Sequence, residues 1–143
     1  MTKRRVGLWA IIGLGVIALA GVVVWRYTAP VEVRIEAVLH DDLPFETETI
    51  PAVVMARPGE MVKVIYRIRN TTLSPIEAFG QYEIAPASAT GQIQVFLSQC
   101  GGLNAYQSNF PSDYEVLFRV QPAGLFGASQ LALRHVFTRA TLR

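Results

Sequence analysis

The 143-residue chain is poor in the side chains that carry most metal and catalytic chemistry. It has one cysteine, Cys100, and two histidines, His40 and His135. A single cysteine excludes an intrachain disulfide, so the thiol pairs with another molecule, binds a metal or is buried and inert. We find no phosphate-binding loop, no nucleophile with a paired base and no carboxylates placed for acid–base work. We therefore predict that the protein is not an enzyme.

Basic residues are outnumbered by acidic residues outside the N-terminal segment. Of thirteen Lys and Arg residues, four precede Val31, which leaves nine against eleven acidic residues and a net charge of −2 from Val31 onward. Nucleic-acid binding needs a concentrated basic face. We therefore exclude nucleic acid as a partner. The four basic residues are Lys3, Arg4, Arg5 and Arg26.

Residues 6–25 contain no charged side chain. At about 1.5 Å per residue, a helix of this length crosses the roughly 30 Å hydrocarbon core of a bilayer. We predict a transmembrane anchor over residues 6–25, preceded by a cytoplasmic segment (1–5) and followed by a linker (26–30) and a domain (31–143). The excess of positive charge before the run predicts an N-in, C-out topology. The short preceding segment favours a bacterial inner membrane, with the domain in the periplasm. Cleavage of a signal peptide after Ala20 is the alternative.

The region from Val31 onward alternates apolar and polar side chains with a period of two, which is typical of half-buried strands. Proline and glycine residues separate these segments, and no segment of helical period and length follows the anchor. Six or seven short strands at this spacing predict an all-β fold, a β-sandwich of immunoglobulin-like type. The predicted strands are 31–37, 45–56, 61–69, 76–84, 93–99, 114–120 and 131–137.

Four segments of the chain resemble the cytochrome c oxidase assembly proteins of the CtaG type, which are copper chaperones for the CuB centre. Segments closer to the C-terminus resemble the same proteins. The four segments are Leu43-Pro44-Phe45, Arg57-Pro58-Gly59-Glu60, Tyr66-Arg67-Ile68-Arg69-Asn70 and Gly80-Gln81-Tyr82-Glu83-Ile84-Ala85-Pro86. In this order, residues 43–137 are similar to the family. The resemblance implies a membrane-anchored periplasmic domain that binds Cu(I) through a Cys-Phe-Cys motif, often as a dimer. It also implies that the partner is subunit I of a haem-copper oxidase.

Cys100 falls where that family has its cysteine pair, at the end of a predicted strand that runs into Gly101-Gly102. We expect the domain to present this thiol. The chain departs from the family at Gly102, because the residue two positions on points to the same side of an extended chain and should be the second cysteine. Three interpretations stay open. Two protomers share one Cu(I) between their Cys100 thiolates, metal binding is lost and the domain only docks on a partner, or Cys100 is buried and inert or forms an intermolecular disulfide.

Other candidate ligands are weaker. The segment His40-Asp41-Asp42 has ligands for a hard metal but lies in a predicted turn, and His135 alternates in register with apolar residues as a satisfied core histidine does. Met55 and Met61 are thioethers that suit Cu(I), although methionine more often fills gaps in a core. Two charged groups read as solvated faces that can steer a partner. The acidic group is Asp41, Asp42, Glu46 and Glu48, and the basic group is Arg57, Lys63, Arg67 and Arg69.

Overall fold

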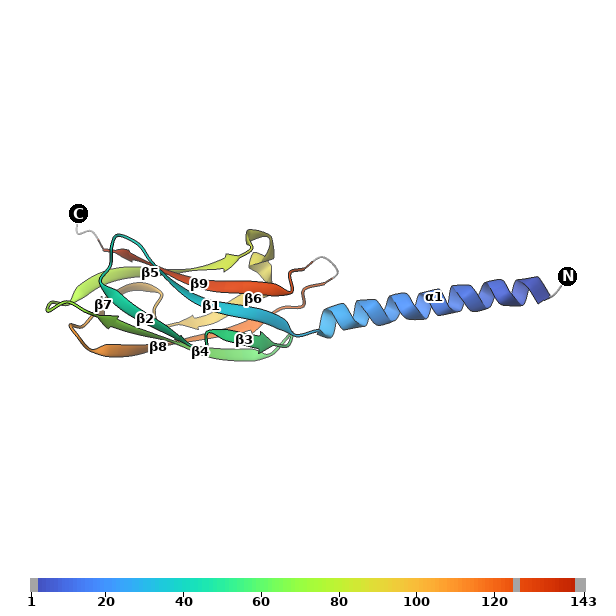
Figure 1. The fold of residues 1–143 in the computed structure, drawn as a ribbon, viewed down its shortest axis with the longest axis horizontal. Coiled ribbons are helices and arrows are strands. Elements are labelled where there is room, and N and C mark those ends of the chain that lie inside the picture. Colours follow the sequence, from blue (N-terminus) through green and yellow to red (C-terminus); the bar gives the residue numbers. More distant parts are fainter. Residues whose placement is uncertain (1–2, 125–126, 141–143) are drawn as a thin grey trace.

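In the computed structural model of the protein, a long N-terminal helix, α1 (Lys3–Thr28), leads into two β-sheets that pack face to face (Figure 1). The structure describes residues 3–124 and 127–140, and the side chains of residues 13–124 and 127–140. The charge-free run over residues 6–25 lies within α1, as a helix. Within the described part of the chain, no helix is long and apolar enough to cross a membrane, so the predicted transmembrane anchor is not confirmed.

The two sheets confirm the prediction of an all-β domain, while its immunoglobulin-like subtype stays a prediction. One sheet has the strand order β3-β1-β9-β5-β7, and the other has the order β2-β4-β8-β6. The pairing of β1 with β9 is parallel, and the pairings of the other named strands are antiparallel. The strands are β1 (Val31–Leu39), β2 (Phe45–Ile50), β3 (Val53–Ala56), β4 (Met61–Asn70), β5 (Ile76–Ala85), β6 (Ile93–Ser98), β7 (Gly102–Tyr106), β8 (Pro111–Val120) and β9 (Gln130–Arg139), with a 3-10 turn, η1 (Ala87–Gln92), before β6.

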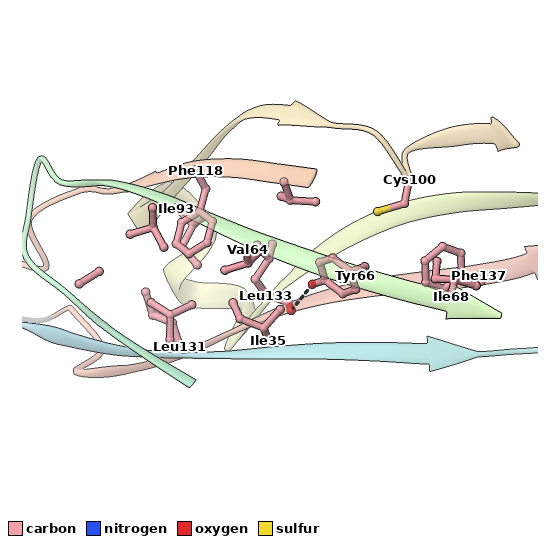
Figure 2. Packing of buried hydrophobic residues seen from close by; sticks show 14 of the residues in the cluster. Ile35, Val64, Tyr66, Ile68, Ile93, Cys100, Phe118, Leu131, Leu133 and Phe137 are labelled. Atoms are coloured by element: carbon pink, nitrogen blue, oxygen red, sulfur yellow. Dashed lines mark hydrogen bonds between the residues drawn. The ribbon is translucent and has the colours of Figure 1, made fainter. Parts of the chain in front are cut away.

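The hydrophobic core lies between the sheets, where the alternation of each strand places it. In β4 every second side chain is buried, and the intervening Lys63, Arg67 and Arg69 face the solvent, as predicted. Strand β8 adds buried side chains beside β4 in the same sheet, and β9 supplies side chains from the facing sheet, so that the cluster is continuous from one sheet to the other (Figure 2). Its members in these three strands are Val62, Val64, Tyr66, Ile68, Val116, Phe118, Val120, Leu131, Leu133 and Phe137.

Two elements differ from the prediction. The strand predicted over residues 45–56 is two strands, because β2 ends at Ile50 before Pro51 and β3 begins at Val53 in the opposite sheet. Proline lacks the N–H that a sheet ladder needs, and here it marks the crossing between sheets rather than an edge or a bulge of one strand. The second element is β7, which was not predicted and which pairs with β5 at the end of its sheet.

Candidate functional site

Cys100 lies in the turn between β6 and β7, two strands at the edges of opposite sheets. Its side chain is 0% exposed. In Figure 2 its sulfur points into the cluster of buried side chains. The expectation that the domain presents the thiol is therefore wrong, because the turn folds the side chain inward. The turn is closed by the N–H of Gly101, which donates to the Ser98 carbonyl oxygen at 3.2 Å.

Two glycines allow this inward turn. Gly80 in β5 pairs with Gly102 at the start of β7, which draws the Cys100 main chain onto β5. A Cβ atom added at Gly80 would lie 2.0 Å from the Cys100 carbonyl oxygen, so a larger residue there must displace the turn. Gly102 has a φ of +79°, in the left-handed region that glycine adopts without steric cost.

Ser98 connects Cys100 to His135 across the core. The Oγ of Ser98 lies 2.8 Å from the Nε2 of His135 and 3.8 Å from the Sγ of Cys100. Ser98 and Cys100 come from the β6–β7 corner, whereas His135 comes from the inner face of β9, 37 residues away from Ser98 in the chain. The structure therefore brings the one thiol of the chain and a buried imidazole onto the same hydroxyl group. We name these three residues the Cys–Ser–His cluster.

His135 is 0% exposed, and only one of its two ring nitrogens has a hydrogen-bond partner among the described residues. Its Nδ1 is buried and has no hydrogen-bond partner among the described residues. The ring of Tyr66 packs against the imidazole with 4.5 Å between ring centroids, but the Tyr66 hydroxyl donates to the Leu133 carbonyl oxygen at 3.2 Å. A buried polar atom without a partner costs free energy, so the reading of His135 as a satisfied core histidine is only partly right.

Burial keeps both titratable groups of the cluster uncharged at neutral pH. Burial raises the pKa of the Cys100 thiol to about 11, and the contact with the Ser98 hydroxyl lowers this pKa by a smaller amount. Burial also lowers the pKa of the His135 imidazole to about 4. A nucleophilic cysteine needs a thiolate at neutral pH, usually beside a cation. The cluster therefore has the wrong protonation state for nucleophilic catalysis.

The other predicted ligands lie elsewhere. The exposed segment His40-Asp41-Asp42 forms the β1–β2 turn, where both aspartates have positive φ and Asp41 accepts a hydrogen bond from the Arg139 N–H at 3.2 Å. Met55 and Met61 are exposed. Met61 is five residues before Tyr66 along β4, about 17 Å from it at the usual rise of a strand. Among the described residues, no group of three or more His, Cys, Asp or Glu side chains is placed to hold a metal ion.

Two members of the predicted basic group pair with two members of the predicted acidic group on the outer face of the β2-β4-β8-β6 sheet. Arg67 pairs with Asp113 at 2.8 Å and with Glu48 at 3.4 Å, and Arg69 pairs with Glu46 at 3.3 Å. These cross-strand pairs are exposed, and such pairs contribute little to stability. The face is a solvated ladder of ion pairs rather than a basic or an acidic binding surface.

The donor set decides how well the cluster fits Cu(I). This ion prefers thiolates and also accepts imidazole nitrogen. The cluster offers at most two ligand atoms, one sulfur and one nitrogen, and both lie in a site closed to water. Ser98 was missed from the sequence, although its position two residues before Cys100 places both side chains on one side of the strand end.

Comparison with known proteins confirms the family resemblance drawn from the sequence. The family described as "Cytochrome c oxidase assembly protein CtaG/Cox11" matches residues 19–128 of the chain. A curated relative, the "Cytochrome c oxidase assembly protein COX11, mitochondrial" of Dictyostelium discoideum, is 27% identical over 123 residues. The match covers 80% of this chain and 38% of the relative, so the chain spans well under half of that protein.

Proposed function

This chain belongs to the CtaG/Cox11 family of cytochrome c oxidase assembly proteins, and from that premise we propose that it handles Cu(I) for the CuB site of oxidase subunit I. The observation that carries the proposal is the Cys–Ser–His cluster. Its sulfur, from the only cysteine of the chain, lies 3.8 Å from a hydroxyl oxygen that also contacts a buried imidazole. The sequence resemblance aligns this cysteine with the family's cysteine pair.

The chemistry of the proposed step is ligand exchange. Cu(I) leaves a ligand on its donor and binds the sulfur of Cys100, and the thiol proton goes to solvent as the metal replaces it. No electron is transferred, because the ion stays in its monovalent state. Cys100 is buried, so its sulfur reaches a donor or an acceptor only when the turn at residues 99–102 opens.

The burial of Cys100, together with the glycine at position 102, favours a second function. In that alternative the protein assists oxidase assembly as a copper-free interaction module on the same fold. The glycine at position 102, where the family resemblance would have the second cysteine of a Cys-x-Cys motif, supports it. Cys100 is then a small apolar side chain of the core, which is a common role for an unpaired cysteine.

The proposed location is the inner membrane of a bacterium, with residues 6–25 as an uncleaved anchor and the β domain in the periplasm. The support comes from the sequence: the run has no charged residue, and Lys3, Arg4 and Arg5 precede it. Alkaline carbonate extraction of membranes tests the anchor, which predicts that the chain stays in the pellet. Recovery of a mature chain that starts at Gly21 would show instead that a signal peptide is cleaved.

Complementation of a strain that lacks the gene separates the two functions. Wild type, Cys100→Ser and the matched control His40→Gln are expressed to equal abundance, and the copper-to-haem ratio of the purified oxidase is measured. Copper handling predicts a low ratio with Cys100→Ser alone. Full restoration by Cys100→Ser favours the copper-free alternative. A normal oxidase in the strain without the gene contradicts both.

A further inference from the structure

The connection between α1 and the β domain is short. Helix α1 ends at Thr28 and β1 begins at Val31, so two residues join them, and two residues span at most about 7 Å. Figure 1 shows the helix meeting the domain at the end of the sandwich where β1 begins. The β3–β4 turn lies at this same end, because Ala56 pairs with Val31. The last turn of α1 and the turn at residues 57–60 are therefore neighbours.

A groove of about 530 Å³ lies between the end of α1 and this turn. The helix contributes Trp25, Tyr27 and Thr28 to its lining, and the turn contributes Arg57 and Pro58. Both aromatic side chains are largely open to solvent, with exposed fractions of 63% for Trp25 and 47% for Tyr27. None of the described residues that line the groove is acidic. The groove therefore combines exposed aromatic rings with a guanidinium group.

The positive charge at this end of the domain is not compensated by ion pairs. Among the described residues, no carboxylate pairs with the Arg57 guanidinium, although the Glu60 carboxylate accepts a hydrogen bond from the Arg57 main-chain N–H at 2.9 Å. By contrast, Arg67 on the outer face of β4 pairs with two carboxylates. Arg26, in the last turn of α1, also forms no ion pair within the described part of the chain, and its guanidinium lies 5.8 Å from the centre of the Trp25 ring. Two cations without counter-charges at one end of the domain attract an anion.

Resting on the proposed membrane location, we propose that this groove binds the headgroup of an anionic phospholipid in the leaflet that surrounds the end of α1. The Arg57 guanidinium donates hydrogen bonds to the phosphate oxygens, for which its planar fork of N–H groups is suited. Arg26 adds a second positive charge beside it. Trp25 and Tyr27 lie where amphipathic rings are favoured, between the headgroups and the hydrocarbon.

The depth of the groove favours a lipid over a free anion. With residues 6–25 in the hydrocarbon core, Trp25 marks the edge of that core. The headgroup layer beyond it is about 5–7 Å thick, and the short connection keeps the β3–β4 turn within this layer. The anion present there at high local concentration is the phosphate of the lipid headgroup. Binding would hold the β domain against the membrane surface through the turn as well as through α1.

The test uses the full chain, purified in detergent and titrated with phosphatidylglycerol or with phosphatidylcholine, while native mass spectrometry measures the lipid bound per chain. Wild type is expected to bind phosphatidylglycerol in preference to phosphatidylcholine. Arg57→Gln is expected to lose about tenfold or more in affinity for phosphatidylglycerol, the factor that corresponds to one hydrogen bond between charged groups. Arg57→Lys, which keeps the charge, is expected to retain most of the preference.

The matched control is Arg139→Gln. Arg139 is exposed at the far end of β9 and likewise forms no ion pair among the described residues. Its replacement is expected to leave lipid binding as in wild type. Near-UV circular dichroism checks that each variant keeps its fold, which is expected because both arginines are exposed.

Four results would overturn the inference. Equal affinity for phosphatidylglycerol in Arg57→Gln and Arg139→Gln, or equal affinity of wild type for the two lipids, would remove the headgroup site and leave the proposed location standing. Displacement of the lipid by inorganic phosphate at a similar concentration would show a site for a free anion instead. Release of the chain from membranes by alkaline carbonate would overturn the proposed location and the headgroup site together.

Discussion

The close approach of Gly80 to the Cys100 main chain gives a quantitative prediction. Replacement of Gly80 by alanine adds a Cβ atom that would lie 2.0 Å from the Cys100 carbonyl oxygen and 3.1 Å from its carbonyl carbon. Both are main-chain atoms, so no side-chain rotation relieves the contact. Either β5 and β7 separate or the turn that carries Cys100 moves outward.

The expected cost follows from a matched control. Gly91→Ala, in the exposed turn η1, adds a Cβ that meets nothing within 4 Å. Both substitutions lower the entropy of the unfolded chain by a similar amount, about 0.4–1 kcal/mol, so this contribution cancels in their difference. The remaining difference is the overpacking cost, about 1–3 kcal/mol. At roughly 4 °C per kcal/mol for a domain of about a hundred residues, Gly80→Ala is expected to melt about 4–12 °C below Gly91→Ala.

Thermal unfolding of the full chain in detergent, followed by near-UV circular dichroism, measures the difference. A second readout follows the turn itself: the rate at which an aromatic disulfide reagent modifies Cys100 is expected to rise in Gly80→Ala and to stay slow in Gly91→Ala. Equal melting temperatures and equal thiol reactivity in the two variants would refute the reasoning. They would mean that Gly80 does not hold the thiol inside.

Three further predictions concern the buried groups of the site. The pKa of His135 is about 4 in the folded chain against 6.5 in the unfolded chain, so only the unfolded state gains a proton as pH falls between these values. Urea unfolding is expected to show that the free energy of unfolding falls by about 3 kcal/mol over that range. In His135→Gln the free energy of unfolding is expected to fall less. The pKa of Cys100 is about 11 in the folded chain against 9.0 in the unfolded chain, so the unfolded state loses its thiol proton first as pH rises. The free energy of unfolding is expected to fall above pH 9, and Cys100→Ala is expected to remove this fall. Alkylation of the thiol in the folded chain is expected to stay slow until the pH approaches 11. Tyr66→Phe removes the hydrogen bond to the Leu133 carbonyl and is expected to destabilise the domain by about 1 kcal/mol in urea, whereas the same change at the exposed Tyr82 is expected to have little effect.

The predictions from the sequence were most accurate for features that depend only on the alternation of side chains within one strand. The alternation of Val62, Val64 and Tyr66 with charged residues depends only on the period of a strand, and β4 follows it along its length. The inward position of His135 follows from the same rule in β9. The place of Cys100 at the end of a strand was also visible from the chain, because apolar residues give way there to two glycines.

The contacts of the site depend on strand order, which alternation does not encode. Ser98 meets His135 only because β6 and β9 lie in facing sheets with their inner faces opposed. The burial of Cys100 depends on a glycine in β5, twenty positions earlier, which reads in isolation as a weak point of a strand. Strand β7 has the composition Gly-Leu-Asn-Ala-Tyr, with low strand propensity, and it forms because β5 offers an edge to pair with.

Gly80 and Gly102 also connect the burial of the Cys100 thiol with the identity of the residue at position 102. Gly102 pairs with Gly80 and adopts a positive φ, and this geometry lets the turn bring Cys100 inside the core. A cysteine at position 102 would carry about 1–2 kcal/mol of backbone strain in this conformation, so a two-thiolate motif and an inward turn oppose each other at this position.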